Sequence, residues 1–210
     1  HNSSMNMIQL LRQPVILISA IVLLFAVGCS DSGTGADESL LETNIAENIP
    51  ANAGAARDAA PDYTFYDLEN GIVIEDSLSG DWDLGFSATS IIANGGQNGP
   101  GQGGIISLDV AFPQVTLAPS EGYSGAPESD WYNYTGQQTQ PLFAVIPKED
   151  FTMVVKTGNG ENYAKIRILS YYYDNPETSS AEFANLETRP DDRYYTFEYT
   201  IQLNGSRDLQ

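Results

Sequence analysis

Asp81 and Asp83 are the nearest candidates in the chain for acid–base chemistry, and they flank Trp82. Paired carboxylates can hydrolyse a glycosidic bond when their environments give them different pKa values. The alternation of Trp82, Leu84 and Phe86 with polar or small residues predicts a strand with one buried face. Both carboxylates then fall on the solvent face, where nothing shifts either pKa. The pair therefore gives little support to catalysis.

The chain has one histidine, His1, and one cysteine, Cys29. We expect His1 to be removed with a signal peptide and the Cys29 thiol to carry lipid, so Ser-His and Cys-His catalytic arrangements cannot form in the mature chain. A single cysteine also excludes an intrachain disulfide and a Cys-cluster metal site. Calcium could bind near Asp191 and Asp192, although no EF-hand loop pattern is present. We therefore expect a protein that is not an enzyme.

Residues 1–28 have the pattern of a secretory signal, with Arg12 as the only charge and an apolar run from Val15 to Val27. Residues 26–29, Ala-Val-Gly-Cys, resemble a bacterial lipobox, in which the cysteine is acylated and becomes the new N-terminus. We predict lipidation at Cys29 and anchoring to a membrane through lipid alone. The alternative is a retained anchor helix with an incidental cysteine.

The composition is strongly acidic, with 9 Lys and Arg against 28 Asp and Glu and a net charge of −19. This balance excludes nucleic acid as a partner and adsorption to anionic lipid, because both need clustered basic residues. Residues 29–61 are rich in Ser, Gly, Ala, Asn and acids, so we predict a flexible acidic tether. Within it, Leu40, Leu41, Ile45 and Ile49 could form a brief helical turn that ends at Pro50.

Residues 62–210 are predicted to form one all-β domain with a mostly antiparallel sheet. Asn70-Gly71 and Gly158-Asn159-Gly160 are hairpin turns between apolar runs. Six glycines within residues 94–104 predict a mobile loop rather than a phosphate loop, since no Gly-Lys-Ser/Thr ending follows. The long loop over 113–141 carries aromatic residues at 131–134, which could cover a flat ligand or pin the loop to the core. Strands are expected over 63–66, 72–74, 82–92, 105–112, 142–147, 151–157, 162–173 and 193–203.

Several of these segments resemble the HmuY-like haem-binding lipoproteins of Gram-negative bacteria. The first match is Asp81-Trp-Asp-Leu-Gly-Phe86, followed by an Ile-rich strand and Asn94-Gly-Gly. The second is Val155-Lys-Thr with the following glycines, then Tyr163-Ala-Lys-Ile and Ser170-Tyr-Tyr. The third is the strand Tyr195-Thr-Phe-Glu-Tyr199. The matches run in order over about residues 79–203, behind the lipobox.

The resemblance implies a lipid-anchored protein of the cell envelope, at the outer membrane, that binds haem or a related porphyrin and passes it to an outer-membrane receptor. Family members hold the iron with two histidines or two methionines, and Met153 is the only such residue expected in the mature chain. Haem-binding candidates are therefore Met153 and the tyrosines, whose oxygen can ligate ferric iron. These tyrosines are Tyr171, Tyr172, Tyr173, Tyr194 and Tyr195. Lys156, Lys165 and Arg167 are the candidates for pairing with haem propionates.

Each assignment has a structural alternative. Met153 shares a strand face with Phe151 and Val155 and would equally fill the core, and the tyrosines would pack in strands. The three basic residues could instead pair with surface acids. At the level of function, the fold could hold haem with non-standard or absent iron ligation. It could instead bind another hydrophobic ligand or a partner protein.

Overall fold

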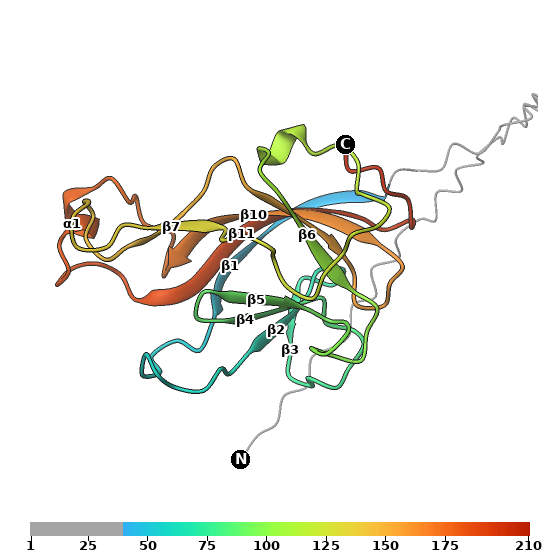
Figure 1. Ribbon diagram of the computed structural model, residues 1–210, viewed down its shortest axis with the longest axis horizontal. Helices are drawn as coiled ribbons and strands as arrows, with labels where there is room; N and C mark the ends of the chain where they lie inside the picture. Colours follow the sequence, from blue (N-terminus) through green and yellow to red (C-terminus); the bar gives the residue numbers. More distant parts are fainter. Residues whose placement is uncertain (1–39) are drawn as a thin grey trace, which may run out of the picture. The chain divides into compact units, whose positions relative to one another are not determined.

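The computed structural model describes residues 40–210, which form three antiparallel sheets with little helix (Figure 1). The all-β, antiparallel prediction is confirmed. The signal peptide predicted over 1–28 and the lipidation predicted at Cys29 lie outside the described residues.

The largest sheet has five strands in the order β1–β11–β10–β9–β6. Short loops join β9 to β10, and the hairpin predicted at residues 158–160 is present. The strands are β1 (Leu41–Pro50), β6 (Gly104–Leu108), β9 (Thr152–Lys156), β10 (Tyr163–Tyr172) and β11 (Asp192–Gln202).

The second sheet has four strands in the order β3–β2–β4–β5. Gly71 has φ +67°, a conformation that glycine adopts without steric cost, and it forms the predicted turn between β2 and β3. The strands are β2 (Thr64–Asp67), β3 (Ile72–Ile74), β4 (Leu84–Ser87) and β5 (Ser90–Ala93).

The remaining elements are short. Strands β7 (Tyr132–Tyr134) and β8 (Val145–Pro147) pair with each other in a separate two-stranded sheet. The 3-10 helix η1 spans Phe112–Gln114, and the helix α1 spans Ala181–Ala184. In Figure 1, β7 and α1 lie toward the same end of the described region.

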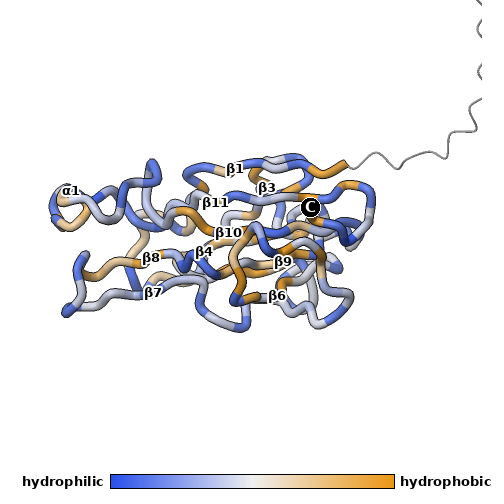
Figure 2. The backbone as a smooth tube through the Cα atoms, turned by 90° about the horizontal axis from the view of Figure 1, so that it is seen from above, coloured by the Kyte–Doolittle hydropathy of each residue, from blue (hydrophilic) through white to orange (hydrophobic). Residues whose placement is uncertain are grey.

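The two larger sheets share one hydrophobic core. The Phe86 ring of β4 lies 4.8 Å from the ring of Tyr195 and 5.4 Å from that of Phe197, both on β11. The apolar face predicted for β11 is buried, with Tyr195, Phe197, Tyr199 and Ile201 in the core, and Thr196, Thr200 and Gln202 on the other face are buried as well. Hydrophobic segments follow the strands, whereas most loops are hydrophilic (Figure 2).

The tether predicted over residues 29–61 is wrong for residues 41–50, which form β1 at the edge of the largest sheet. The expected helical turn is wrong for the same residues. Only Ala46 and Ile49 of β1 are buried hydrophobic residues, so the segment has the composition of a linker. Its pairing with β11 supplies the backbone hydrogen bonds that fix it as a strand. The folded region therefore begins before residue 62.

The glycine-rich segment 94–104 is closely packed, contrary to the mobile loop that we predicted. Asn94 is fully buried, and its side-chain amide donates to the carbonyls of Ser79 and Trp82. A Cβ atom built on Gly99 would lie 2.5 Å from the Trp82 ring, and one on Gly101 would lie 2.5 Å from the Gly158 carbonyl oxygen. The glycines are required by this close approach of backbone to Trp82 and to the β9–β10 turn.

Candidate functional site

Met153 packs in the core between the two larger sheets. Its exposed fraction is 0%, and Phe151 and Val155 on the same strand face are also buried. Met153 is therefore a packed core residue, as the structural alternative stated. An iron atom cannot reach the Met153 sulfur without displacing core side chains.

Three of the predicted tyrosines belong to a buried aromatic cluster. Tyr171 and Tyr195 lie 5.4 Å apart between ring centroids, and Trp131 packs 5.3 Å from Tyr195. Burial raises the pKa of the Tyr171 and Tyr195 hydroxyls above the ordinary value, which disfavours the phenolate that would ligate ferric iron. Trp131 donates to the Thr89 carbonyl, so this aromatic residue pins its long loop to the core.

Tyr172 is buried as well, and its hydroxyl accepts a 3.0 Å hydrogen bond from the Val145 amide. Burial raises its pKa. Tyr173 and Tyr194 differ from the other tyrosines, because Tyr173 is 46% exposed and the Tyr194 ring packs against it at 5.2 Å. These two rings form a surface pair rather than part of the buried cluster.

The predicted basic residues lie on the opposite face of the largest sheet from Met153. Register places Ile166 across from Met153 and Lys165 across from Val154, so Lys165 and Met153 point to opposite faces. The Lys165 ammonium donates to the Val115 carbonyl and lies 4.8 Å from the Phe112 ring centroid. Burial lowers the pKa of Lys165.

Arg167 forms an ion pair with Glu198 on β11, at 2.5 Å. This is the surface pairing that we weighed as the alternative to propionate binding. Lys156 is half-buried at the end of β9. The predicted haem-binding and propionate-pairing residues are therefore not brought together into one site.

Two hollows at the end of the described region that carries β7 and α1 are better placed to receive a ligand. The first, which we call the Arg189 hollow, has a volume of about 500 Å³, within the range of ligand pockets. Its lining includes the predicted Tyr172, which is buried, and two exposed hydrophobic residues, Phe143 and Leu186. Its charged lining residues are Arg57, Arg189, Asp191 and Asp192.

Arg189 is held in place by its neighbours. Its Nε donates to the Phe183 carbonyl and its Nη1 to the Leu142 carbonyl, each at 2.8 Å. Its guanidinium lies over the Phe183 ring at 4.6 Å. The remaining nitrogen, Nη2, is buried and has no hydrogen-bond partner among the described residues. Arg189 therefore gives the hollow a fixed positive charge, but its unpaired nitrogen is buried and is not exposed to the hollow.

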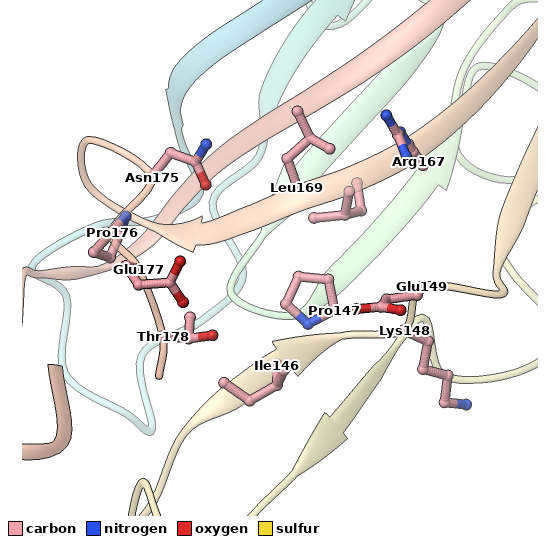
Figure 3. A pocket seen from close by; sticks show the side chains of 11 residues that line it. Ile146, Pro147, Lys148, Glu149, Arg167, Leu169, Asn175, Pro176, Glu177 and Thr178 are labelled. Carbon is pink, nitrogen blue, oxygen red and sulfur yellow. The ribbon is translucent and has the colours of Figure 1, made fainter. Parts of the chain in front are cut away.

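The second hollow, which we call the β10 hollow, has a volume of about 550 Å³ and lies between β8, β10 and residues 175–178 (Figure 3). Ile146 and Pro147 face it from β8, and Leu169 faces it from β10. Arg167, from the predicted propionate set, also lines it. Apolar side chains thus line its middle, with charged groups toward its ends.

Asp83 is not on the solvent face, contrary to the prediction from alternation. It is 2% exposed, and its carboxylate accepts hydrogen bonds from the Leu68 amide at 2.7 Å and the Gly158 amide at 2.6 Å. Burial raises its pKa from 3.8 to about 7, and the nearby carboxylates Asp67 and Glu69 add to the shift. Asp81, by contrast, is exposed. The two carboxylates face different surroundings and do not form a catalytic pair.

Arg57, Phe143, Leu186 and Arg189 were missed in the sequence because they lie far apart in the chain and in no recognisable motif. The only usable signal was the length of the loop over 113–141, which precedes Phe143. Among residues 40–210, no group of three metal-ligating side chains converges, and no helix is long and apolar enough to cross a membrane.

The sequence matches no protein-family model, and no curated protein is significantly similar to it. The fold and its surface define an all-β domain, and the Arg189 hollow and the β10 hollow are two of its ligand-sized surface hollows.

Proposed function

We propose that the chain is a lipid-anchored, non-catalytic binding protein of the Gram-negative envelope, of the HmuY-like kind. We further propose that it binds haem or a related tetrapyrrole without an iron ligand from the protein. The resemblance of three ordered segments supports the ligand class. One structural observation carries the proposal, namely that the Arg189 hollow combines exposed apolar side chains with two arginines.

The buried candidates do not fit axial ligation of iron, and the surface pair of Tyr173 and Tyr194 lines neither hollow. Met153, Tyr171 and Tyr195 are buried in the core, and the Tyr172 hydroxyl already accepts a hydrogen bond from Val145. Binding through contacts to the macrocycle and its carboxylates is the mode that the lining of the Arg189 hollow can supply. It requires no ionised tyrosine and no exposed sulfur.

The Arg189 hollow fits this second mode. Phe143 and Leu186 offer apolar surface, since they are 39% and 55% exposed. Arg57 is exposed, and its guanidinium matches a carboxylate in geometry, whereas Arg189 contributes a fixed positive charge to the lining. Because Asp191 and Asp192 line the same hollow, the arginines must supply the attraction locally. Transfer to an outer-membrane receptor remains part of the proposal.

Leu186→Ser tests the apolar contact. Covering the exposed part of a leucine contributes on the order of 1 kcal/mol, so the variant should bind haem about fivefold more weakly in an absorbance titration. Leu78→Ser is the matched control, because Leu78 is 82% exposed and lines neither hollow. Equal affinities of the two variants for haem would contradict binding in the Arg189 hollow.

Arg57→Gln tests the carboxylate contact separately. It should weaken binding of a dicarboxylic porphyrin and leave binding of the corresponding dimethyl ester unchanged. The same loss for both porphyrins would contradict a role for Arg57 in carboxylate recognition.

A partner protein is the second candidate ligand. It is favoured by a different observation, the open strand edge in the β10 hollow.

A further inference from the structure

Strand β10 has two neighbours over its first half and one over its second half. The β9–β10 ladder ends where Ile166 pairs with Met153, whereas the β10–β11 ladder continues to Tyr172 opposite Asp192. Residues 167–172 therefore have no strand partner on the side where β9 lies. This open edge borders the β10 hollow, whose lining includes residues 167–169.

The direction of the free backbone groups follows from the hydrogen bonds of the ladders. The Thr157 amide donates to the Asn162 carbonyl at 3.0 Å, and hydrogen-bonded pairs alternate along an antiparallel ladder. Residues 164 and 166 therefore bond to β9, and Ile168 is the next residue whose amide and carbonyl point to that side. No hydrogen bond of either group to a described residue outside the strands is found.

The β1–β11 ladder leads to the same direction for the backbone groups of Ile168. The Leu203 amide donates to the Leu40 carbonyl, so odd-numbered residues of β11 bond to β1. Phe197 faces Ile168 in register but directs its backbone groups toward β1. Ile168 lines the hollow, so its backbone N–H and C=O border the hollow without a partner strand.

Strand β8 lies across the hollow and does not fill this vacancy. Among the described strands it pairs only with β7, and it ends at Pro147, which has no amide hydrogen to donate. Its Ile146 and Pro147 side chains instead form the apolar wall opposite Leu169 (Figure 3).

We propose that the β10 hollow binds an extended segment of a partner protein, which adds as a strand to the open edge of β10 at Ile168. The occupant must supply both a backbone acceptor and a backbone donor, as an extended polypeptide does. This inference is independent of tetrapyrrole binding, because the two hollows share no lining residue.

The charges at the two ends of the hollow define the partner further. At one end Arg167 is ion-paired with Glu198 and the Lys148 ammonium donates to the Asp130 carbonyl, and Glu177 lies at the other end (Figure 3). The segment should therefore carry an apolar residue in the middle and a basic residue toward Glu177.

The test is selection of a phage-displayed library of random twelve-residue peptides on the full chain, with counter-selection on Leu169→Glu. Enriched peptides should bind the native chain about tenfold more tightly than the Leu169→Glu variant. N-methylation at the central residue should weaken them by a similar factor, since it removes the backbone donor. Binding should also slow hydrogen exchange of the Ile168 amide.

Two further variants keep the test decisive. Leu117→Glu, at a residue that is 58% exposed and outside the hollow, should bind the peptides like the native chain. Glu177→Lys, at an exposed residue, should lose the basic-ended peptides even if Leu169→Glu folds poorly. The proposal is overturned if no peptide distinguishes the native chain from both hollow variants, or if N-methylated peptides bind equally well.

Discussion

At the scale of single residues, Asp83 and Asn94 form a polar centre where three segments meet. The Asp83 carboxylate joins the β2–β3 turn to the β9–β10 turn through the amides of Leu68 and Gly158. Asn94 accepts from the Gly101 amide and donates to the Trp82 carbonyl. Buried polar groups with all their partners fix one arrangement of the backbone, so this centre sets how the glycine-rich segment packs.

The raised pKa of Asp83 predicts a specific dependence of stability on pH. Between pH 3.8 and about 7, Asp83 keeps its proton in the folded chain and loses it in the unfolded chain. The contribution of Asp83 to the free energy of unfolding therefore falls as pH rises through this window and is constant above it. The full shift corresponds to roughly 4 kcal/mol.

Urea unfolding of the native chain and Asp83→Asn, at several pH values from 4 to 8, measures this effect. The native chain should lose more stability than the variant as pH rises, because asparagine does not ionise. Parallel curves would show that Asp83 is already charged in the folded chain at low pH.

Alternation predicted the buried residues Trp82, Leu84 and Phe86 but failed for Asp83. The apolar period describes one face of an isolated strand, and it carries no information about what covers the other face. Here the β9–β10 turn covers Asp83. The Gly158 amide in this turn donates to the Asp83 carboxylate, although Gly158 is far from Asp83 in the sequence. A contact of this kind leaves no local signal in the sequence.

At the scale of elements, β1 shows how an edge strand can have the composition of a linker. It pairs with β11 from Leu41 to Pro50, with an irregularity between Ala46 and Ile49. The strand has a buried side and an exposed side. Ile49 lies on the buried side, with 8% of its surface exposed, and Ile45 lies on the exposed side, with 58% exposed.

Ile49→Asn and Ile45→Asn compare the two sides with one chemical change. Ile49→Asn places a polar group in the core and should lower the free energy of unfolding by about 2–4 kcal/mol. Ile45→Asn should change it by about 0.5 kcal/mol or less. Equal small effects in urea unfolding would mean that residues 41–50 are a tether after all.

Local turn chemistry explains which elements were predictable. Asn70-Gly71 and Gly158-Asn159-Gly160 marked hairpins that are present, because these residues favour tight turns between strands. The hollows depend instead on loops that the sequence does not define. Phe143 has φ +54°, which is uncommon for a bulky residue and has no sequence signature, yet it sets where the Phe143 ring lies in the Arg189 hollow.

At the scale of the whole molecule, each hollow where a ligand is proposed to bind has two cations and two carboxylates in its lining. Lys148 and Arg167 line the β10 hollow, and Arg57 and Arg189 line the Arg189 hollow, which is four of the nine Lys and Arg residues. The net charge of −19 opposes an anionic ligand at long range. Such a ligand must therefore be held by these local cations.

The proposed anchor is tested at Cys29. In a Gram-negative host, the chain should incorporate labelled palmitate and partition with membranes, and Cys29→Ser should abolish both. Continued membrane association of Cys29→Ser would favour the retained anchor helix over lipidation.

The most direct test of the proposed function is a pair of absorbance titrations of residues 30–210, free of any histidine tag. One uses ferric haem and the other uses metal-free protoporphyrin. Binding through the macrocycle and its carboxylates predicts saturable shifts near one equivalent for both, with dissociation constants within about threefold of each other, a difference of less than 1 kcal/mol. No saturable shift with either ligand at micromolar protein would contradict tetrapyrrole binding. A shift with haem alone would contradict the absence of an iron ligand.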